Sequence, residues 1–209
     1  AIGGALVANG STITLMNFDT SAGTFTANTS VVVVNMSGGI IRVPQALSSL
    51  TVNPGVTTSF ASNIAWSAVL TLTGSTATFA GNLNSVGSAA LLFTNATVAI
   101  AGSWNTSSAS GFTATGSSVT FTGSGQTVAT GAGQQFATLT ISGSIVLASN
   151  LAASSLAVGA SGTLTKTNYS ITFNDLTVNG TIADGSVRVT NLSVTNSDGT
   201  ALVTIPVFS

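Results

Sequence analysis

The chain has 209 residues, of which 44% are hydrophobic and only 3% are charged, and it contains neither histidine nor cysteine. Three basic residues and a net charge of −1 argue against nucleic acid as a partner, because few phosphate counterions would be displaced on binding. The composition also excludes disulfide bonds, thiolate chemistry and zinc sites, and no apolar run approaches the roughly 18 residues of a transmembrane segment.

Short strand-like pieces occupy the first part of the chain, at residues 11–15, 23–27, 31–34 and 40–43. They fit the later repeat less well, and a soft boundary is expected near Pro44. We therefore predict that residues 1–45 form an N-terminal β segment, which is also a candidate subunit-linking strand. Residues 46–209 are predicted to form a β-repeat domain.

From residue 46 onward, blocks of alternating apolar and polar residues recur and end at glycine or asparagine. Their first residues lie 16 to 28 positions apart, most of them close to 20, and are Leu50, Leu70, Leu91, Val119, Leu139, Leu156, Leu176 and Leu192. A period of two predicts half-buried strands, and the terminal glycine or asparagine supplies a turn. Further strands are expected at residues 77–81, 98–102, 145–147 and 170–173.

A repeat of about 20 residues with one strong strand is typical of a β-solenoid, in which each coil stacks on the one before. No window sustains the i, i+3, i+4 apolar spacing of a helix. The predicted fold is therefore all-β, a β-solenoid (β-helix) of about 20-residue coils. The alternative is a pilin-like β-sandwich that is completed by a donor strand from a neighbouring subunit.

Both ends of the chain are apolar and uncharged, whereas solenoids that stay monomeric carry polar caps. Uncapped strands pair with strands of other molecules. We expect subunits to join head to tail as a homopolymer, through candidate interface strands that contain Ala5, Leu6, Val7, Ile13 and Leu15 at one end and Leu202, Val203, Ile205, Val207 and Phe208 at the other.

The stretch from Ser103 to Leu164 is similar to the degenerate repeats of secreted bacterial and archaeal surface proteins with a β-solenoid fold. The similarity is carried by Gly102-Ser103-Trp104-Asn105 and by residues 119–128, 136–143 and 162–164. It covers less than half of the chain, and it implies a cell-surface or fibre protein but does not define an active site. The composition also resembles that of archaeal extracellular filament subunits that are joined by donor-strand complementation.

Asparagine residues frequently have serine or threonine two positions on, which is the acceptor pattern for N-glycosylation. Chance would give about five such sites among 16 asparagines in a chain nearly one-third serine and threonine. The chain has eight candidate sites, Asn9, Asn28, Asn35, Asn95, Asn105, Asn168, Asn179 and Asn191. Covalent glycans would hydrate a surface that carries few charged residues. The alternative is that these asparagines are unmodified and stack on one another in turns.

The sequence contains few candidate catalytic residues. Asp175, Asp184 and Asp198 are close enough in sequence for a carboxylate pair, but the last two stand in Asp-Gly turn dipeptides. Their spacing does not match a calcium loop, and a Lys166–Asn crosslink has little support. We predict that the protein is not an enzyme and that it has no cofactor and no metal site.

The sequence also contains candidate residues for two other surface functions. Trp66, Trp104 and Tyr169 would form a sugar-stacking platform if exposed, and Trp104 is the best candidate for exposure. Aromatic residues in such chains more often fill the core or cap a corner. Thr-x-Thr pairs would suit ice binding in one flat array, but we expect them not to keep one register across the coils. The pairs are Thr71/Thr73, Thr76/Thr78, Thr113/Thr115, Thr120/Thr122, Thr138/Thr140, Thr163/Thr165 and Thr165/Thr167.

The preferred interpretation is a structural subunit of an extracellular filament or cell-surface layer that assembles through apolar terminal strands. The alternative is a cell-surface adhesin or carbohydrate-binding module. Because the sequence begins at Ala1, we expect a protein that is secreted after removal of a signal peptide.

Overall fold

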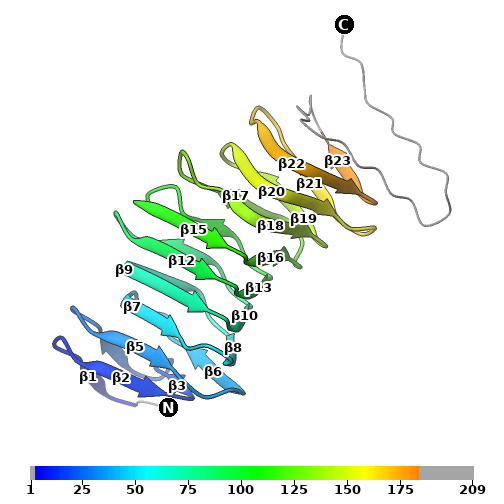
Figure 1. Ribbon diagram of the computed structural model, residues 1–209. Helices are drawn as coiled ribbons and strands as arrows, with labels where there is room; N and C mark the ends of the chain where they lie inside the picture. The colour runs from blue at the N-terminus through cyan, green and yellow to red at the C-terminus, as the bar shows by residue number, and fades with distance from the viewer. Residues whose placement is uncertain (1–2, 184–209) are drawn as a thin grey trace, which may run out of the picture.

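The computed structural model describes residues 3–183, which form an all-β structure without a helix. Parallel strands stack as a β-solenoid of about 9 turns that follow one another about 20 residues apart (Figure 1). The β-solenoid prediction is therefore confirmed. These residues include no helix of the length and hydropathy that crossing a bilayer would require.

One side of the solenoid is a nine-stranded parallel sheet to which each coil contributes one strand. Its register runs without a shift from the third strand to the last. In stacking order the strands are β3 (Phe18–Asp19), β6 (Gly39–Arg42), β8 (Thr57–Phe60), β10 (Thr76–Phe79), β13 (Thr97–Ile100), β16 (Ser118–Phe121), β18 (Phe136–Ile141), β20 (Leu151–Val158) and β22 (Ile171–Val178).

The other sides belong to a twelve-stranded sheet and a two-stranded sheet, β1 (Ala5–Val7) with β4 (Thr24–Thr26). The larger sheet forks at β9 (Ile64–Thr73), whose first residues pair with β11 (Leu83–Ser85) and whose last residues pair with β12 (Ala90–Thr94). The remaining strands are β2 (Thr12–Leu15), β5 (Val31–Val34), β7 (Leu47–Val52), β14 (Trp104–Asn105), β15 (Gly111–Thr115), β17 (Gln126–Ala129), β19 (Ser144–Leu147), β21 (Thr163–Thr165) and β23 (Thr181–Ala183).

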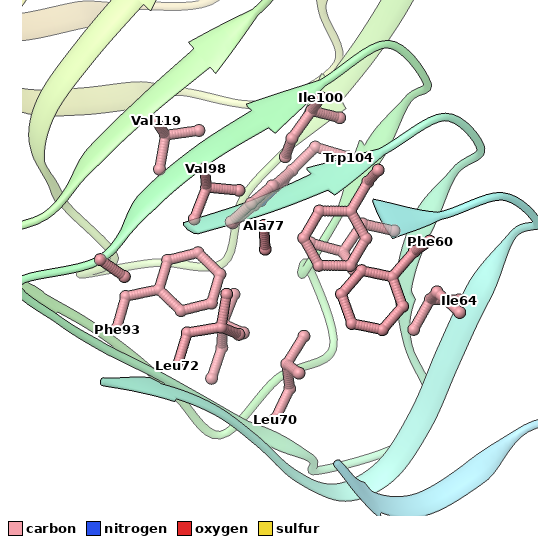
Figure 2. Close-up of a cluster of buried hydrophobic side chains, with 14 of the residues drawn as sticks. Phe60, Ile64, Leu70, Leu72, Ala77, Phe93, Val98, Ile100, Trp104 and Val119 are labelled. Atoms are coloured by element: carbon pink, nitrogen blue, oxygen red, sulfur yellow. The ribbon is translucent and has the colours of Figure 1, made fainter. Parts of the chain in front are cut away.

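The alternation in the sequence becomes an inside and an outside of each coil. Side chains at equivalent inward positions stack into columns, such as Phe60, Phe79, Ile100 and Phe121 of the nine-stranded sheet. All four are fully buried, and the Phe60 and Phe79 rings stack with centroids 4.5 Å apart. Figure 2 shows Phe60 and Ile100 in a cluster with Leu70 and Leu72 of the opposite sheet. The buried apolar residues form one core along the solenoid.

At one corner of the solenoid the coils approach so closely that only glycine fits. A Cβ atom built on Gly143 would lie 1.7 Å from the carbonyl oxygen of Gly123 in the preceding coil. Gly102 stands in the same relation to Gly81 one coil earlier. The glycines that end many sequence blocks therefore serve stacking as well as turning.

The stack passes without interruption through the position at which a domain boundary was expected. β5 and β6, from the first 45 residues, pair with β7 and β8 of the following region. Residues 3–45 therefore form coils of the same solenoid as the residues after them.

Candidate self-assembly site at the first coil

The first coil has one open edge. Its strands β1, β2 and β3 pair with β4, β5 and β6 of the second coil, and within residues 3–183 they have no partner on the other side. Figure 1 shows this coil at the blue end of the stack. Residues 1 and 2 lie outside the described part, so the edge is defined by residues 5–19.

The apolar side chains of this coil are less buried than their counterparts one coil further on. Leu6, Ile13 and Leu15 pack against the core but keep part of their surface in solvent. Their register partners Phe25, Val32 and Val34 are only 3%, 1% and 0% exposed. One additional coil, stacked in the same register, would bury the three first-coil residues in the same way.

The outward side of the first coil is also apolar in part. Val7 is 56% exposed and Met16 is 38% exposed, whereas Ala5 is a small exposed residue of β1. β1 and β2 contain no charged residue and no proline, which are the usual devices that keep a sheet edge from pairing. The five predicted N-terminal interface residues thus lie together on the open edge.

A single ion pair flanks this edge among the described residues. Asp19 at the end of β3 lies 3.6 Å from Arg42 of β6, and its carboxylate accepts hydrogen bonds from the backbone and hydroxyl groups of Ser21. These Ser21 hydrogen bonds, with the Arg42 charge as a weaker cause, lower the pKa of Asp19 below its ordinary value. The pair is solvent-exposed and contributes little to stability.

The predicted interface residues at the other end, Leu202, Val203, Ile205, Val207 and Phe208, lie outside the described residues. The last complete coil of the described residues contains β21 and β22, and β23 pairs with β21 as the start of the next coil. Val178 of β22 and Ile182 of β23 pack against the core and are partly exposed.

Seven of the eight candidate glycosylation sites lie within the described residues, and all seven are exposed. They are Asn9, Asn28, Asn35, Asn95, Asn105, Asn168 and Asn179, whereas Asn191 lies outside. Asn28 and Asn95 have positive φ angles of 46° and 50°, which are typical of asparagine in turns. Asn28 also donates a hydrogen bond to Asn9, so these two asparagines stack across adjacent coils.

Trp104, the best candidate for exposure among the three aromatic residues, is buried. Trp104 and Trp66 are 0% exposed, and Tyr169 packs partly buried against the core. The Trp104 indole N–H donates to Thr106 Oγ1 at 2.9 Å, and Thr106 donates in turn to Gln134 at 2.6 Å. The indole is therefore satisfied inside the solenoid, and no sugar-stacking platform forms at these residues.

The acidic residues singled out above do not converge within the described part. Asp175 is exposed on β22, and Asp184 and Asp198 lie outside residues 3–183. No group of three or more potential metal ligands occurs among the described residues. A shallow depression over β11, β14 and β17 is lined by Asn82, Leu83, Asn84, Ser103, Trp104, Asn105, Thr127, Ala129 and Ala148, none of which is ionisable.

As predicted, the Thr-x-Thr pairs as a set do not keep one register, because they lie on two different sheets. Two of them, Thr76/Thr78 and Thr138/Thr140, nevertheless occupy equivalent positions of the nine-stranded sheet, together with Ser118/Thr120 between them. The missed signal was the mixture of serine and threonine at positions i and i+2. Counting threonine alone breaks these columns.

Comparisons with known protein families, curated proteins and solved structures found no match for this chain.

Proposed function

We propose that this protein is a structural subunit of an extracellular filament or cell-surface layer, in which copies join end to end. The observation that carries the proposal is the open edge of the first coil, where β1, β2 and β3 are paired on one side only among residues 3–183. Exposed strands without charge or proline, such as β1 and β2, add a further strand readily. The incoming strands come from a second copy of this chain.

Backbone groups at the edge support strand addition. The carbonyl oxygens of Ser11 and Leu15 accept hydrogen bonds from Val31 and Asn35 in the second coil. Successive residues of a strand direct their backbone groups to opposite sides, so those of Thr12 and Thr14 face the open edge. Each hydrogen bond that they form with an added strand contributes about 0.5–1.5 kcal/mol net.

Side-chain burial also favours the addition of strands at the first coil. Leu6, Ile13 and Leu15 keep part of their surface in solvent, although their counterparts in the second coil are buried. Full burial of such a side chain contributes about 1.5–3 kcal/mol, so completing the burial of each adds roughly 1 kcal/mol. The low charge of the chain leaves little long-range repulsion to oppose association.

A solenoid that adds a copy at one end forms a head-to-tail contact, and contacts of this kind generate open filaments when the rotation does not close a ring. In this proposal the partner surface is the carboxy-terminal part of the neighbouring copy, which contains the apolar stretch from Leu202 to Phe208. Glycans on the exposed turn asparagines would project sideways and leave the stacking axis free.

The test introduces charge at the edge. In the double variant Val7→Lys/Thr14→Lys, both substituted side chains are exposed on the first coil. The control Thr127→Lys/Val146→Lys replaces the same residue types, also exposed, on β17 and β19 in the middle of the stack. Assembly is measured by sedimentation and negative-stain electron microscopy of the purified full chain, with circular dichroism as a check of folding.

The proposal predicts that the unmodified chain and the control form extended polymers and that the edge variant stays folded and monomeric. Monomers of the unmodified chain at all concentrations would refute it. Equal assembly of the edge variant and the control would also refute it, because the contact would then lie elsewhere.

A further inference from the structure

The outward side of the nine-stranded sheet carries a regular lattice of hydroxyl groups, which we call the hydroxyl face. It comprises the two outward positions of six successive strands, β8, β10, β13, β16, β18 and β20. The residues are Thr57/Ser59, Thr76/Thr78, Thr97/Ala99, Ser118/Thr120, Thr138/Thr140 and Ser155/Ala157. Ten of these twelve positions therefore carry a hydroxyl group.

The hydroxyl face has two fixed spacings. Neighbouring strands lie about 4.8 Å apart, and outward residues two positions apart along a strand are separated by roughly 6.6 Å. Six strands in unbroken register therefore give a lattice about 24 Å long. The spacing between strands is close to the shorter oxygen repeat on the prism face of hexagonal ice, and the spacing along a strand is about a tenth shorter than the longer repeat.

The ten hydroxyl groups are available to solvent. None of them makes a side-chain hydrogen bond to another protein atom among the described residues, although other serines and threonines of the chain do, such as Thr130 and Ser149. Most of the ten residues are exposed, and the others are partly exposed. Their hydrogen-bonding capacity is directed outward.

Among residues 3–183, no large or charged side chain covers the lattice. The next outward positions along the strands hold small residues, beginning with Ala61, Ala80 and Ala101. The nearest described charges on this sheet are Arg42 on β6 and Asp175 on β22, one at each end and outside the six strands. A face of this kind does not hold water in the orientations that a charge would impose.

We propose that the hydroxyl face binds ice. Threonine and serine hydroxyls at ice-like spacing join the hydrogen-bond network of the crystal, while the threonine methyl groups and the two alanines favour ordered water between them. Each contact is weak, but the rigid sheet presents ten of them at once without a conformational cost. This function is independent of the open edge of the first coil.

Crystalline polysaccharide is a less suitable occupant of the same face. Sugar rings bind to flat surfaces chiefly by stacking on aromatic side chains, and the hydroxyl face contains none. The exposed large apolar residues of the described chain are aliphatic or methionine, and only Ile40 of β6 lies on this sheet, outside the lattice.

The test places a bulky side chain in the lattice. Thr78→Tyr and Thr97→Tyr each change an exposed threonine of the hydroxyl face, and Thr113→Tyr and Thr127→Tyr change exposed threonines of β15 and β17 as matched controls. Tyrosine is a good strand former, so all four variants are expected to fold. Thermal hysteresis and inhibition of ice recrystallisation are measured in the full chain, together with retention on crystalline cellulose and chitin.

The proposal predicts ice activity in the unmodified chain, a loss of at least tenfold in Thr78→Tyr and Thr97→Tyr, and no such loss in the two controls. Absence of ice activity in the unmodified chain would overturn it. So would equal loss in face variants and controls, or retention on polysaccharide that is lost through the same face variants. Repeating the assay in Val7→Lys/Thr14→Lys separates ice binding from self-assembly, because that variant leaves the hydroxyl face intact.

Discussion

Replacement of Trp104 by alanine is expected to cost about 3–5 kcal/mol of unfolding free energy, the range measured for deleting a buried aromatic side chain. Trp104 is 0% exposed, and its ring lies 5.2 Å from Phe136 and 5.4 Å from Phe112 between ring centroids. The variant also leaves the Thr106 hydroxyl without its indole donor. The upper part of the range is therefore expected.

The assay is equilibrium unfolding in guanidinium chloride followed by circular dichroism. Because coils of a solenoid contact mainly their neighbours, the loss is expected to weaken the central coils first and to broaden the transition. Trp104→Phe keeps an aromatic ring and loses the indole N–H, so it should cost less than Trp104→Ala. Val146→Ala, at a position 38% exposed, serves as a surface control and should change stability by less than about 0.5 kcal/mol.

The result that would refute this reasoning is a cost below about 1 kcal/mol for Trp104→Ala, which is the value of an ordinary surface contact. Native tryptophan fluorescence gives a second check. Both tryptophans are 0% exposed, so the emission should be blue-shifted and resistant to acrylamide quenching.

Two further predictions concern the corner glycines and acid. Gly143→Ala should destabilise the solenoid strongly, because its Cβ would lie 1.7 Å from the Gly123 carbonyl oxygen. The control Gly111→Ala, whose Cβ would have no atom within 4 Å, should be neutral or stabilising by up to about 1 kcal/mol. Thermal melts compare the two variants, and equal melting temperatures would contradict the close stacking of the coils at Gly143. The melting temperature should stay nearly constant from pH 5 to 9 and fall slightly in stronger acid. The reason is that the Ser21 hydrogen bonds lower the pKa of Asp19 in the folded state, so the stability that the ionised Asp19 gives to the fold is lost as the pH falls through this pKa. Asp19→Asn should reduce this acid-induced fall, and an unchanged fall would assign it to other carboxyl groups.

Local alternation was enough to predict the strands and the fold class. In Leu139-Thr140-Ile141 the outer two residues are buried and the middle one faces outward, as the pattern indicates. This works because one face of every strand meets the core, so the period of two survives in each short block. A repeat near 20 residues then favours a coil that closes on itself over a sandwich.

The same alternation did not show to which side of the coil a block belongs. Leu91 pairs with Leu70 on the twelve-stranded sheet, whereas Val119 pairs with Val98 and Leu139 on the nine-stranded sheet. The interval of 28 residues between Leu91 and Val119 therefore arises because these two residues lie on different sheets, and not because one coil is unusually long. Strands on both sides have the same local pattern, so only pairing between coils distinguishes them.

The partners of Trp104 and the alignment of the hydroxyl face could not be predicted for the same reason. Gly102-Ser103-Trp104-Asn105 does not show which residues lie beside the indole, whereas in the structure Trp104 pairs with Leu83 and Val128 at an inward position. Its polar atom is satisfied by Thr106, and Thr106 by Gln134 from the next coil. Such long-range partners follow from the register, which the sequence pattern alone does not fix.

The most direct test of the central claim is cryo-electron microscopy of assemblies grown from the purified chain. The account predicts filaments in which the strand spacing of about 4.8 Å continues through every subunit junction, with the first coil of one copy paired to the end of the next. Filaments in which subunits contact each other sideways through sheet faces, with the first-coil edge left open to solvent, would contradict it.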